Sequence, residues 1–533
     1  MQIRRTLALT IAISALTLLI VALLSFDRLH AFLSAGSGHS VTAAYVGRFR
    51  MRALVCAVVA LAIAVIAWIR ELPPRRRIDV PSPTPAAWII IGIGAAVRVP
   101  LLFLPPRYDE AYTVNDLVRH GPAFFLLRYT APNNHVFHTL LVWIVRVFAG
   151  DRMWALRLPA FAAGIAVLVA TYALARRFSG ETAALLATGL AAAASPLVEY
   201  SAQARGYTIL TLVFLLLFLI DDELLAAIAL AVGAFTIPTM IYAAASWALW
   251  AAITQRDWRR AVNVAAIGGA LTLLLYFPIF VVSGVDTITS NGNTLSVPYR
   301  ILIHALPETF VETARLWSLS YTMPLAILLA LAAIIAIVRR TPAAMPLVCA
   351  IAAILVMLAV TRKVPFPRVW LFVMPLYLLA AVSTIAWPPI KRLEFAIITL
   401  TALLAFNAWR VTDRYDSYED PAMADAPAVA DAIRALPAGA RVLVTTPLDA
   451  PFLFYVPERI VQDRFDSDPA AVRAEVLRTK QMYFVASTRN DSFNPMAMYN
   501  QLRLPYELDV AKRFSHSILF ELRLPADSPP SRR

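Results

Sequence analysis

Residues 86–112 read AAWIIIGIGAAVRVPLLFLPPRYDEAY, an apolar run long enough to cross a membrane, followed at once by two carboxylates, Asp109 and Glu110. Because the acidic pair comes directly after the run, we expect it in water close to the membrane surface. Carboxylates are costly to desolvate at such a boundary, which indicates function. Asp109 is the better general base, since it comes first and partial burial raises the pKa of a carboxyl group. The alternative is that both acids cap a short helix, as acids in a first turn do.

The composition is that of a polytopic membrane protein. The chain has 533 residues, 60% hydrophobic and 15% charged, with a mean hydropathy of +0.67, which is too apolar for a soluble protein of this size. The net charge of +14 does not indicate nucleic-acid binding, because many arginines lie in short clusters between apolar segments. Cys56 and Cys349 fall inside apolar segments, so no disulfide framework is implied. Residues 1–26 lack a good signal-peptidase site, so we expect a retained first helix.

Hydropathy predicts about 13 membrane-spanning helices. They are residues 6–26, 53–69, 86–104, 156–175, 182–199, 207–220, 224–237, 238–253, 261–282, 321–338, 343–360, 370–386 and 394–409. Those between 207 and 253 are weakly delimited, because two of them are short for a span. The run at 138–148 is too short to span and carries Arg146, so it is interpreted as an interfacial helix. The positive-inside rule puts the basic cluster at 70–77 in the cytoplasm, with the N-terminus, and Asp109 outside.

Two further segments are expected on the outer side. Residues 283–320 form a long loop with a turn signal at 291–293 and an amphipathic stretch at 298–317, which we interpret as a candidate lid. After residue 410 the composition becomes that of a soluble domain. Its pattern predicts helices and strands, with no cysteine and no Gly-rich phosphate loop. The helices are expected at 427–436 and 468–480, and the strands at 441–446, 481–486 and 513–524.

The predicted organisation is therefore mainly α. A transmembrane domain covers residues 1–410, including an outer loop with interfacial helices at about 105–155. A small α/β domain, to which the sequence assigns no chemistry, covers residues 411–533.

Cationic side chains are expected on the same side of the membrane as Asp109; they are His135, Arg205, Lys363 and Arg368. Such groups hold the phosphate of a lipid whose tail stays in the membrane. For any single arginine the alternative is snorkelling to lipid head groups. It is the conjunction with the carboxylate pair that favours a site. No zinc site is expected, because His135 and His138 lack a third ligand at a recognisable spacing, and the adjacent Asp-Glu pair is weak evidence for a divalent cation.

The order of these features resembles the GT-C glycosyltransferases that use polyprenyl-phosphate sugars, specifically the protein O-mannosyltransferase and lipid A aminoarabinose transferase group of glycosyltransferase family 39. The resemblance is good over about residues 86–220, and the order of its short motifs carries the specificity. The matching residues are Asp109-Glu110 after a span, Asn133-Asn134-His135, Phe148-Ala149-Gly150, Arg157-Leu158-Pro159-Ala160, Ala175-Arg176-Arg177-Phe178-Ser179-Gly180, Ser195-Pro196, Tyr200-Ser201-Ala202-Gln203-Ala204-Arg205-Gly206-Tyr207 and, later, Pro367-Arg368.

The resemblance implies an enzyme in which Asp109, beside Glu110, deprotonates an acceptor hydroxyl that displaces polyprenyl phosphate with inversion. Residues expected near the donor phosphate are Asn134, His135, Arg205, Lys363 and Arg368. Residues expected at the substrate are Tyr112, Asn133 and Tyr207. The implied partners are a polyprenyl-phosphate sugar, membrane lipids and a lipid, glycan or protein acceptor, without a cofactor. The implied location is the bacterial inner membrane, with the C-terminal domain in the periplasm.

One departure from the group leaves the sugar open. The aminoarabinose transferases have Lys-Pro-Pro where this chain has Asn134-His135-Val136. His135 and Lys363 are the candidate replacements for the missing lysine.

Two other classes stay open. A transporter or lipid flippase also needs many helices and charged groups, but it places them near the bilayer midplane in broken helices and shows repeated halves. Here the candidate residues are expected at one face, and no internal repeat is visible. The other alternative is a non-catalytic membrane scaffold. The presence of both Asp109 and Arg205 argues against it.

Overall fold

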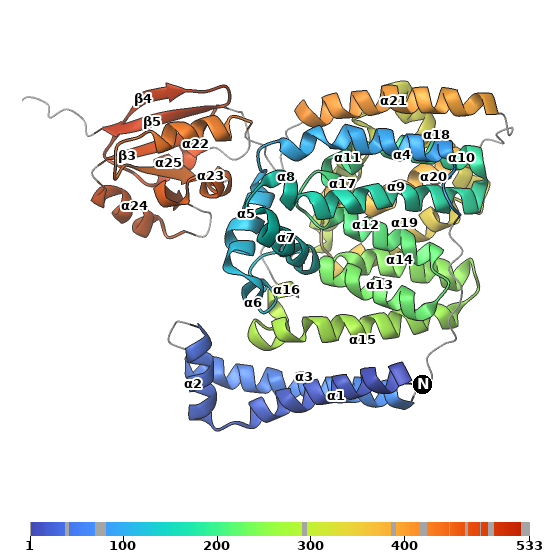
Figure 1. Ribbon diagram of the computed structural model, residues 1–533, viewed down its shortest axis with the longest axis horizontal. Helices are drawn as coiled ribbons and strands as arrows, with labels where there is room; N and C mark the ends of the chain where they lie inside the picture. The colour runs from blue at the N-terminus through green and yellow to red at the C-terminus, as the bar shows by residue number, and fades with distance from the viewer. Residues whose placement is uncertain are drawn as a thin grey trace, which may run out of the picture. The chain divides into compact units, whose positions relative to one another are not determined.

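The computed structural model describes residues 2–37, 42–69, 81–289, 296–384, 391–414, 424–446, 448–463, 467–479, 481–488 and 495–523. In these residues the chain is mainly helical and carries one small sheet (Figure 1). It divides into two compact units whose segments alternate along the chain. The helical unit is Met1–Val99, Pro122–Leu141 and Leu158–Thr412, and the mixed unit is Pro100–Gly121, Val142–Arg157 and Asp413–Arg533.

The helical unit contains nearly all of the long apolar helices. Its elements are α1 (Gln2–Leu23), α2 (Phe26–Ser37), α3 (Ala43–Ile69), α4 (Pro85–Arg98), α6 (Pro122–Phe125), α9 (Leu158–Ser179), α10 (Glu181–Ala192), α11 (Ser195–Ser201), α12 (Tyr207–Leu219), α13 (Glu223–Thr236), α14 (Met240–Ile253), α15 (Trp258–Val282), α16 (Asp286–Thr289), α17 (Tyr299–Ser318), α18 (Met323–Val338), α19 (Met345–Thr361), the 3-10 helix η4 (Pro367–Val373), α20 (Met374–Val382) and α21 (Lys391–Arg414). The first turns of α7 (Val136–Ala149) belong to it as well.

The prediction of about 13 spans is wrong. Among the described residues, five helices are long and apolar enough to cross a membrane, and two bent helix pairs raise the number to at most seven. The reason is length: α12 has 13 residues and α13 and α14 have 14 each, or about 20 Å of helix against about 30 Å of hydrocarbon. The five are Ala43–Trp68, Pro85–Phe103, Leu158–Ser179, Trp258–Val282 and Leu393–Thr412.

One expected span, residues 182–199, is broken. Helices α10 and α11 meet at a bend of 63°, just before Pro196 near the start of α11. At the break the fully buried Arg98 of α4 donates from Nη1 to Ala192 O at 3.0 Å, and to Gly94 O of its own helix at 2.6 Å. A Cβ at Gly94 would lie 2.6 Å from Leu168 Cδ1, so glycine is needed for this close packing. Arg98 thus satisfies a carbonyl that the break removes from the helix.

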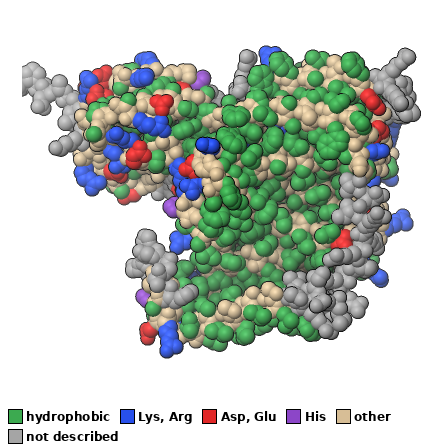
Figure 2. All heavy atoms as spheres, viewed as in Figure 1, with side chains coloured by type: hydrophobic (Ala, Val, Ile, Leu, Met, Phe, Trp, Pro, Cys, Tyr) green, Lys and Arg blue, Asp and Glu red, His purple; other side chains and the backbone are tan. Residues whose placement is uncertain are grey.

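The surface of the helical unit is apolar. Large hydrophobic side chains with more than half of their surface exposed occur on many of its helices, and Figure 2 shows such side chains covering the visible face. Examples are Ile13, Leu23, Ile66, Trp88, Ile334 and Phe395. A surface of this kind is expected where a protein faces lipid, so the chain is a multi-pass membrane protein.

The mixed unit is built on a five-stranded sheet of order β2-β1-β3-β5-β4. Strand β1 is parallel to β2 and β3, whereas β5 is antiparallel to β3 and β4. In register, Val442 lies opposite Ile460 on one side and Tyr483 on the other. The strands are β1 (Arg441–Thr445), β2 (Ile460–Asp463), β3 (Met482–Ser487), β4 (Glu507–Arg513) and β5 (Ser517–Arg523).

Helices cover both faces of this sheet. Alternation along β1 sends Val442 and Val444 into one apolar layer, with α22 (Ala426–Arg434) and α23 (Asp449–Tyr455). Leu443 enters the opposite layer, with α24 (Pro469–Arg478) and α25 (Pro495–Gln501). The short η5 (Pro457–Arg459) leads into β2.

The elements predicted after residue 410 are mostly confirmed. The expected helices at 427–436 and 468–480 are α22 and α24, and the expected strands at 441–446 and 481–486 are β1 and β3. The single strand expected at 513–524 is wrong at its start, because Arg513 ends β4 and pairs with Ile518 of β5 across a hairpin. The structure adds β2, α23, α25 and β4, which the sequence did not indicate.

Four short elements from the first half of the chain complete the mixed unit. They are η1 (Pro100–Phe103), α5 (Tyr108–Asp116), η2 (Val118–His120) and α8 (Met153–Leu156), with the C-terminal turns of α7. Helix α7 forms where a helix was expected at 138–148. Helix α17 forms over the predicted amphipathic stretch at 298–317, while the turn signal at 291–293 lies outside the described residues.

Candidate active site

The carboxylate pair lies in the first turn of α5, in the mixed unit. Arg107 is the N-cap of this helix, and its backbone N–H donates to Glu110 Oε2 at 3.0 Å. The Asp109 carbonyl accepts from Thr113 Oγ1 at 2.9 Å. Acidic residues at this end of a helix are favoured by its dipole, which accounts locally for both of them.

Glu110 forms a buried ion pair with Arg157. Arg157 Nε and Nη2 donate to the two Glu110 carboxylate oxygens at 2.8 and 2.7 Å, and the two side chains are 2% and 0% exposed. The remaining Arg157 protons serve the carbonyls of the loop before α5; these acceptors are Leu101, Leu102, Leu104 and Pro105. A bidentate pair with satisfied donors fixes the loop geometry. These contacts give Glu110 a structural role, and the helix-cap alternative describes it well; a catalytic role for Glu110 stays a prediction.

Asp109 is the neighbouring carboxylate, and its residue is 6% exposed. Its backbone is fixed by the Glu110–Arg157 pair one residue along the chain. Asp109 is thus a buried carboxylate in the first turn of α5, at a position that the neighbouring Glu110–Arg157 pair holds in place.

A second group of candidate residues lies in the helical unit, around the start of α7. Asn134 Nδ2 donates to the carbonyls of Phe125 and Arg128 at 2.9 and 3.0 Å, which folds the loop onto itself. His135 Nδ1 accepts from the Gly206 backbone N–H at 2.9 Å. Position 206 must be glycine, because a Cβ there would lie 2.5 Å from Thr236 Cγ2. The contact joins two motifs, at 133–135 and 200–207, that are far apart in sequence.

His135 is a neutral hydrogen-bond donor in this setting. Burial lowers the pKa of its imidazole well below the ordinary range, and electrostatic interactions with Arg205, His138 and Arg368 lower it further. Since Nδ1 accepts a hydrogen bond, the neutral ring carries its proton on Nε2. A neutral His135 supplies no positive charge, but it can donate to a phosphate oxygen; its place near the donor phosphate stays a prediction.

Two arginines with nearly buried side chains lie around His135. Arg205 is 2% and Arg368 is 9% exposed. The Arg205 guanidinium lies 5.5 Å from the Tyr207 ring centroid, and the His135 ring meets the Tyr207 ring edge-on at 5.1 Å. Arg368, at the start of η4, stacks on Phe366 at 4.6 Å. The structure thus brings His135, Arg205, Tyr207 and Arg368 together, as the resemblance implied.

One residue of this cluster was missed from the sequence. Tyr129 is buried, which raises the pKa of its phenol, and the Tyr207 phenol raises that pKa further while the Arg205 charge opposes both. The Tyr129 hydroxyl therefore stays protonated beside Arg205. It lies in no recognised motif, so only the fold could reveal it.

The other predicted residues lie apart from this cluster or in the mixed unit. Lys363 is half-buried, and its ammonium donates to Thr289 O at 3.2 Å. Asn133 is half-buried beside Asn134, and its carbonyl accepts from the His135 N–H at 2.9 Å. Tyr112 is half-buried on α5, 6.3 Å from the Tyr108 ring.

No group of three or more histidine, cysteine or acidic side chains able to hold a metal ion occurs in the described part of the chain. His135 and His138 have no third such partner there. The described residues thus include a buried carboxylate, Asp109, in the mixed unit and a buried, aromatic-lined cationic cluster in the helical unit.

Comparisons with known proteins bear on the fold and on one stretch of the sequence. Residues 135–283 match the family described as dolichyl-phosphate-mannose-protein mannosyltransferase. The solved structure of apo ArnT from Cupriavidus metallidurans is similar with a TM-score of 0.53 and 13% identity, over 81% of this chain and 97% of that chain. The chain has the GT-C glycosyltransferase fold.

Two further structures resemble this GT-C chain with TM-scores too low to support an argument. They are the Archaeoglobus fulgidus oligosaccharyltransferase with zinc and sulfate, at 0.47 and 14% identity over 80% of this chain and 72% of that chain, and ArnT of Cupriavidus metallidurans bound to undecaprenyl phosphate, at 0.43 and 13% identity over 82% and 98%. The sequence matches none of the curated proteins. The resemblance to the GT-C glycosyltransferases is confirmed, and the family match includes His135, Arg205 and Tyr207 but not Asp109 or Arg368.

Proposed function

We propose that the protein transfers a sugar from a polyprenyl-phosphate donor to an acceptor hydroxyl, with inversion, on the periplasmic side of a bacterial inner membrane. The N-terminus lies in the cytoplasm and the C-terminal domain in the periplasm. The acceptor is a lipid, a glycan or a protein, and the chain carries out the reaction without a cofactor.

The observation that carries the proposal is the cationic cluster of the helical unit. Arg205 and Arg368 place two like charges in a buried, aromatic-lined setting, and both act on His135. A guanidinium fork fits phosphate oxygens, so two arginines beside a ring N–H donor can together hold one phosphate group. Because the cluster belongs to a unit with an apolar outer surface, a phosphate whose lipid tail stays in the membrane fits it best.

Each residue has a defined part in the step. Asp109 accepts the proton of the acceptor hydroxyl, and the acceptor oxygen forms a bond to the anomeric carbon. The bond from that carbon to the phosphate oxygen breaks, and its electron pair leaves with polyprenyl phosphate. Arg205 and Arg368 stabilise the charge that develops on the leaving phosphate, and His135 Nε2 donates to it. Tyr112, Asn133 and Tyr207 contact the sugar or the acceptor, and Lys363 the outer edge of the phosphate.

The lid role of residues 283–320 belongs to the same proposal. Helix α17 packs against η4, which carries Arg368. The segment before α17 is tied to the end of α19 by Val297 N–H to Arg362 O at 2.8 Å. Protease cleavage in this segment should slow when undecaprenyl phosphate is added, and unchanged cleavage would count against a lid.

The reaction is tested by measuring transfer from a panel of radiolabelled polyprenyl-phosphate sugars in membranes that contain the wild-type chain, Asp109→Asn or Asp116→Asn. We expect Asp109→Asn to lower kcat by about 10² to 10⁴ while binding of the lipid donor is kept. Asp116→Asn removes a carboxylate from the other end of α5 and should stay active. Equal turnover by wild type and Asp109→Asn would remove Asp109 from the chemistry. A product with retained anomeric configuration would remove inversion.

A transporter or flippase has one observation in its favour, the broken span at α10 and α11, because broken spans are common in transporters. In this chain, however, the Arg98 guanidinium donates to the carbonyl of Ala192, the last residue of α10. This carbonyl therefore already has a hydrogen-bond partner within the fold. Movement of labelled polyprenyl phosphate across vesicles without sugar transfer would favour the transporter.

A further inference from the structure

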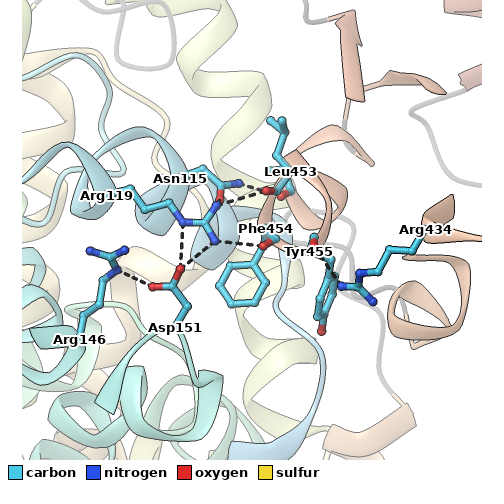
Figure 3. A network of polar contacts seen from close by, with 9 residues as sticks. Asn115, Arg119, Arg146, Asp151, Arg434, Leu453, Phe454 and Tyr455 are labelled. Atoms are coloured by element: carbon cyan, nitrogen blue, oxygen red, sulfur yellow. Dashed lines mark hydrogen bonds and ion pairs between the residues drawn. The ribbon is translucent and has the colours of Figure 1, made fainter. Parts of the chain in front are cut away.

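Helix α5 is attached to the C-terminal domain by side chains that follow Asp109 along the chain. Arg119, in η2, donates from Nη1 to Leu453 O at 3.2 Å and from Nη2 to Phe454 O at 3.0 Å, so it caps the C-terminal end of α23 (Figure 3). Asn115, in α5, donates from Nδ2 to Ala450 O of α23 at 2.9 Å. All three acceptors are backbone carbonyls of one helix.

The attachment is itself held in orientation. Asn115 Oδ1 accepts from Arg119 Nη1 at 2.8 Å, so the two side chains act together. The Arg119 guanidinium lies 5.3 Å from the Phe454 ring centroid. Its Nε and Nη2 donate to Asp151 Oδ2 at 3.1 and 2.9 Å, and Asp151 also pairs with Arg146 of α7. The fork of Arg119 is thus fixed between a carboxylate and two carbonyls, which a lysine could not reproduce.

Charge favours this network over a wide pH range. Burial would raise the pKa of Asp151, but hydrogen bonds and charges from Arg146 and Arg119 outweigh it and bring the pKa below its ordinary value. Asp151 therefore stays ionised through the neutral range and keeps Arg119 in place.

The short α5 needs such support. It has nine residues, and isolated helices of that length are marginal in water. The Glu110–Arg157 pair holds its first turn, whereas Asn115 and Arg119 hold its last turn against α23. The end of α23 also lies within electrostatic reach of the first turn, because burial raises the pKa of Tyr455 to about 12 while Arg157 lowers it and Glu110 raises it. Asp109 therefore lies on a helix that is held at its first turn and at its last turn.

We propose that Arg119 is a positioning residue for Asp109, and that α23 of the C-terminal domain is the fixed body against which it holds the Asp109 helix in its reactive orientation. The inference rests on the proposed function and deepens it, because it gives the C-terminal domain a direct part in catalysis. A carboxylate displaced by about 1 Å loses about 10²-fold in rate without any change at the sugar donor.

The test compares Arg119→Ala, Arg119→Lys and Arg434→Ala in the full-length protein. Arg434 is the matched control: its Nη2 donates to Tyr455 O, the next carbonyl of α23, but from within the C-terminal domain. Arg119→Ala should lower kcat by about 10²-fold with the KM for the sugar donor unchanged. Arg119→Lys should recover part of kcat through Asp151, and Arg434→Ala should match the wild type.

A second readout does not depend on turnover. Amide hydrogen exchange of residues 108–116 should accelerate in Arg119→Ala and stay at the wild-type rate in Arg434→Ala. Unchanged exchange in Arg119→Ala overturns the inference, and so does faster exchange with an unchanged kcat. Should Arg119→Ala fail to fold, Asn115→Ala removes one attachment alone and is read in the same way. Absence of transfer by the wild type rejects the proposed function, while the exchange rates still decide whether α23 holds α5.

Discussion

The mixed unit and the helical unit bury charge in opposite ways. In the mixed unit, Glu110 and Arg157 neutralise each other, and four backbone carbonyls take up the remaining donors. In the helical unit, Arg205 and Arg368 bring charge of one sign to a neutral His135 and to aromatic rings. A buried charge whose partners lie within the loop serves the architecture. A group of buried arginines beside aromatic rings is a candidate site for an anionic ligand.

The largest effect is expected from breaking the buried Glu110–Arg157 ion pair of the mixed unit. Arg157→Met should destabilise the protein by about 3–5 kcal/mol, because it leaves Glu110 buried without its partner. Combining it with Glu110→Leu should recover much of the loss, since removal of both partners leaves no buried charge. The measurement is thermal unfolding of the full-length protein in detergent. If the single variant unfolds like the wild type, Glu110 and Arg157 do not hold the loop.

Removing a charge from the cationic cluster of the helical unit should instead weaken lipid binding and change the stability little. Arg205→Met should weaken binding of undecaprenyl phosphate by roughly 10- to 100-fold, the equivalent of a charge-assisted hydrogen bond of about 1.5–3 kcal/mol, with little change in unfolding temperature. Arg128→Met, which replaces an exposed arginine of the same unit, is the control. A large fall in unfolding temperature with unchanged lipid affinity would make Arg205 part of the architecture instead.

The neutral state of His135 gives a smaller, pH-dependent effect. Because its folded pKa lies well below the ordinary value of 6.5, the unfolded chain binds more protons than the folded chain below pH 6.5, and this term of the stability falls as the pH falls. Above that pH the term vanishes. His135→Gln should therefore reduce the loss of thermal stability between pH 7 and pH 5. An identical pH profile in variant and wild type would mean that His135 is charged in the folded protein.

Lys363 should show the smallest effect, since its ammonium is half-buried and hydrogen-bonded to a backbone carbonyl. Lys363→Ala should weaken binding of undecaprenyl phosphate less than Arg205→Met does, with a change in stability of about 0.5 kcal/mol or less. Parallel lipid titrations of the two variants would rank them. A loss equal to that of Arg205 would move Lys363 into the phosphate-binding cluster.

Sequence patterns predicted the fold class and much of the C-terminal domain, because β1 and β3 are mostly apolar and α22 is amphipathic. The prediction of membrane spans failed where the length of a helix decides whether it can cross the membrane. Helices α12, α13 and α14 are apolar throughout, so composition counted each as a span, although none is long enough. The sequence patterns also merged β4 with β5, because the hairpin at 514–516 carries no glycine or proline to mark the turn.

Sequence motifs predicted several of the candidate site residues, but they did not predict which of these residues contact one another. The motif at 200–207 pointed to Arg205 and Tyr207, which the structure places beside His135. Sequence order could not show that Glu110 is taken by Arg157, or that Gly206 donates to His135, because both contacts join distant segments. Nor could it show Arg119 reaching α23, where every acceptor is a main-chain oxygen and leaves no pattern in the sequence.

Arg98 has a consequence for how the chain is made. Its acceptor at Ala192 lies 94 residues further along, so the ribosome delivers α4 well before α10 exists. For that interval the span carries a guanidinium without its final partner, close to the end where water and lipid head groups are within reach. The contact that satisfies the last carbonyl of α10 can therefore form only once α10 has been made, long after α4 has left the ribosome.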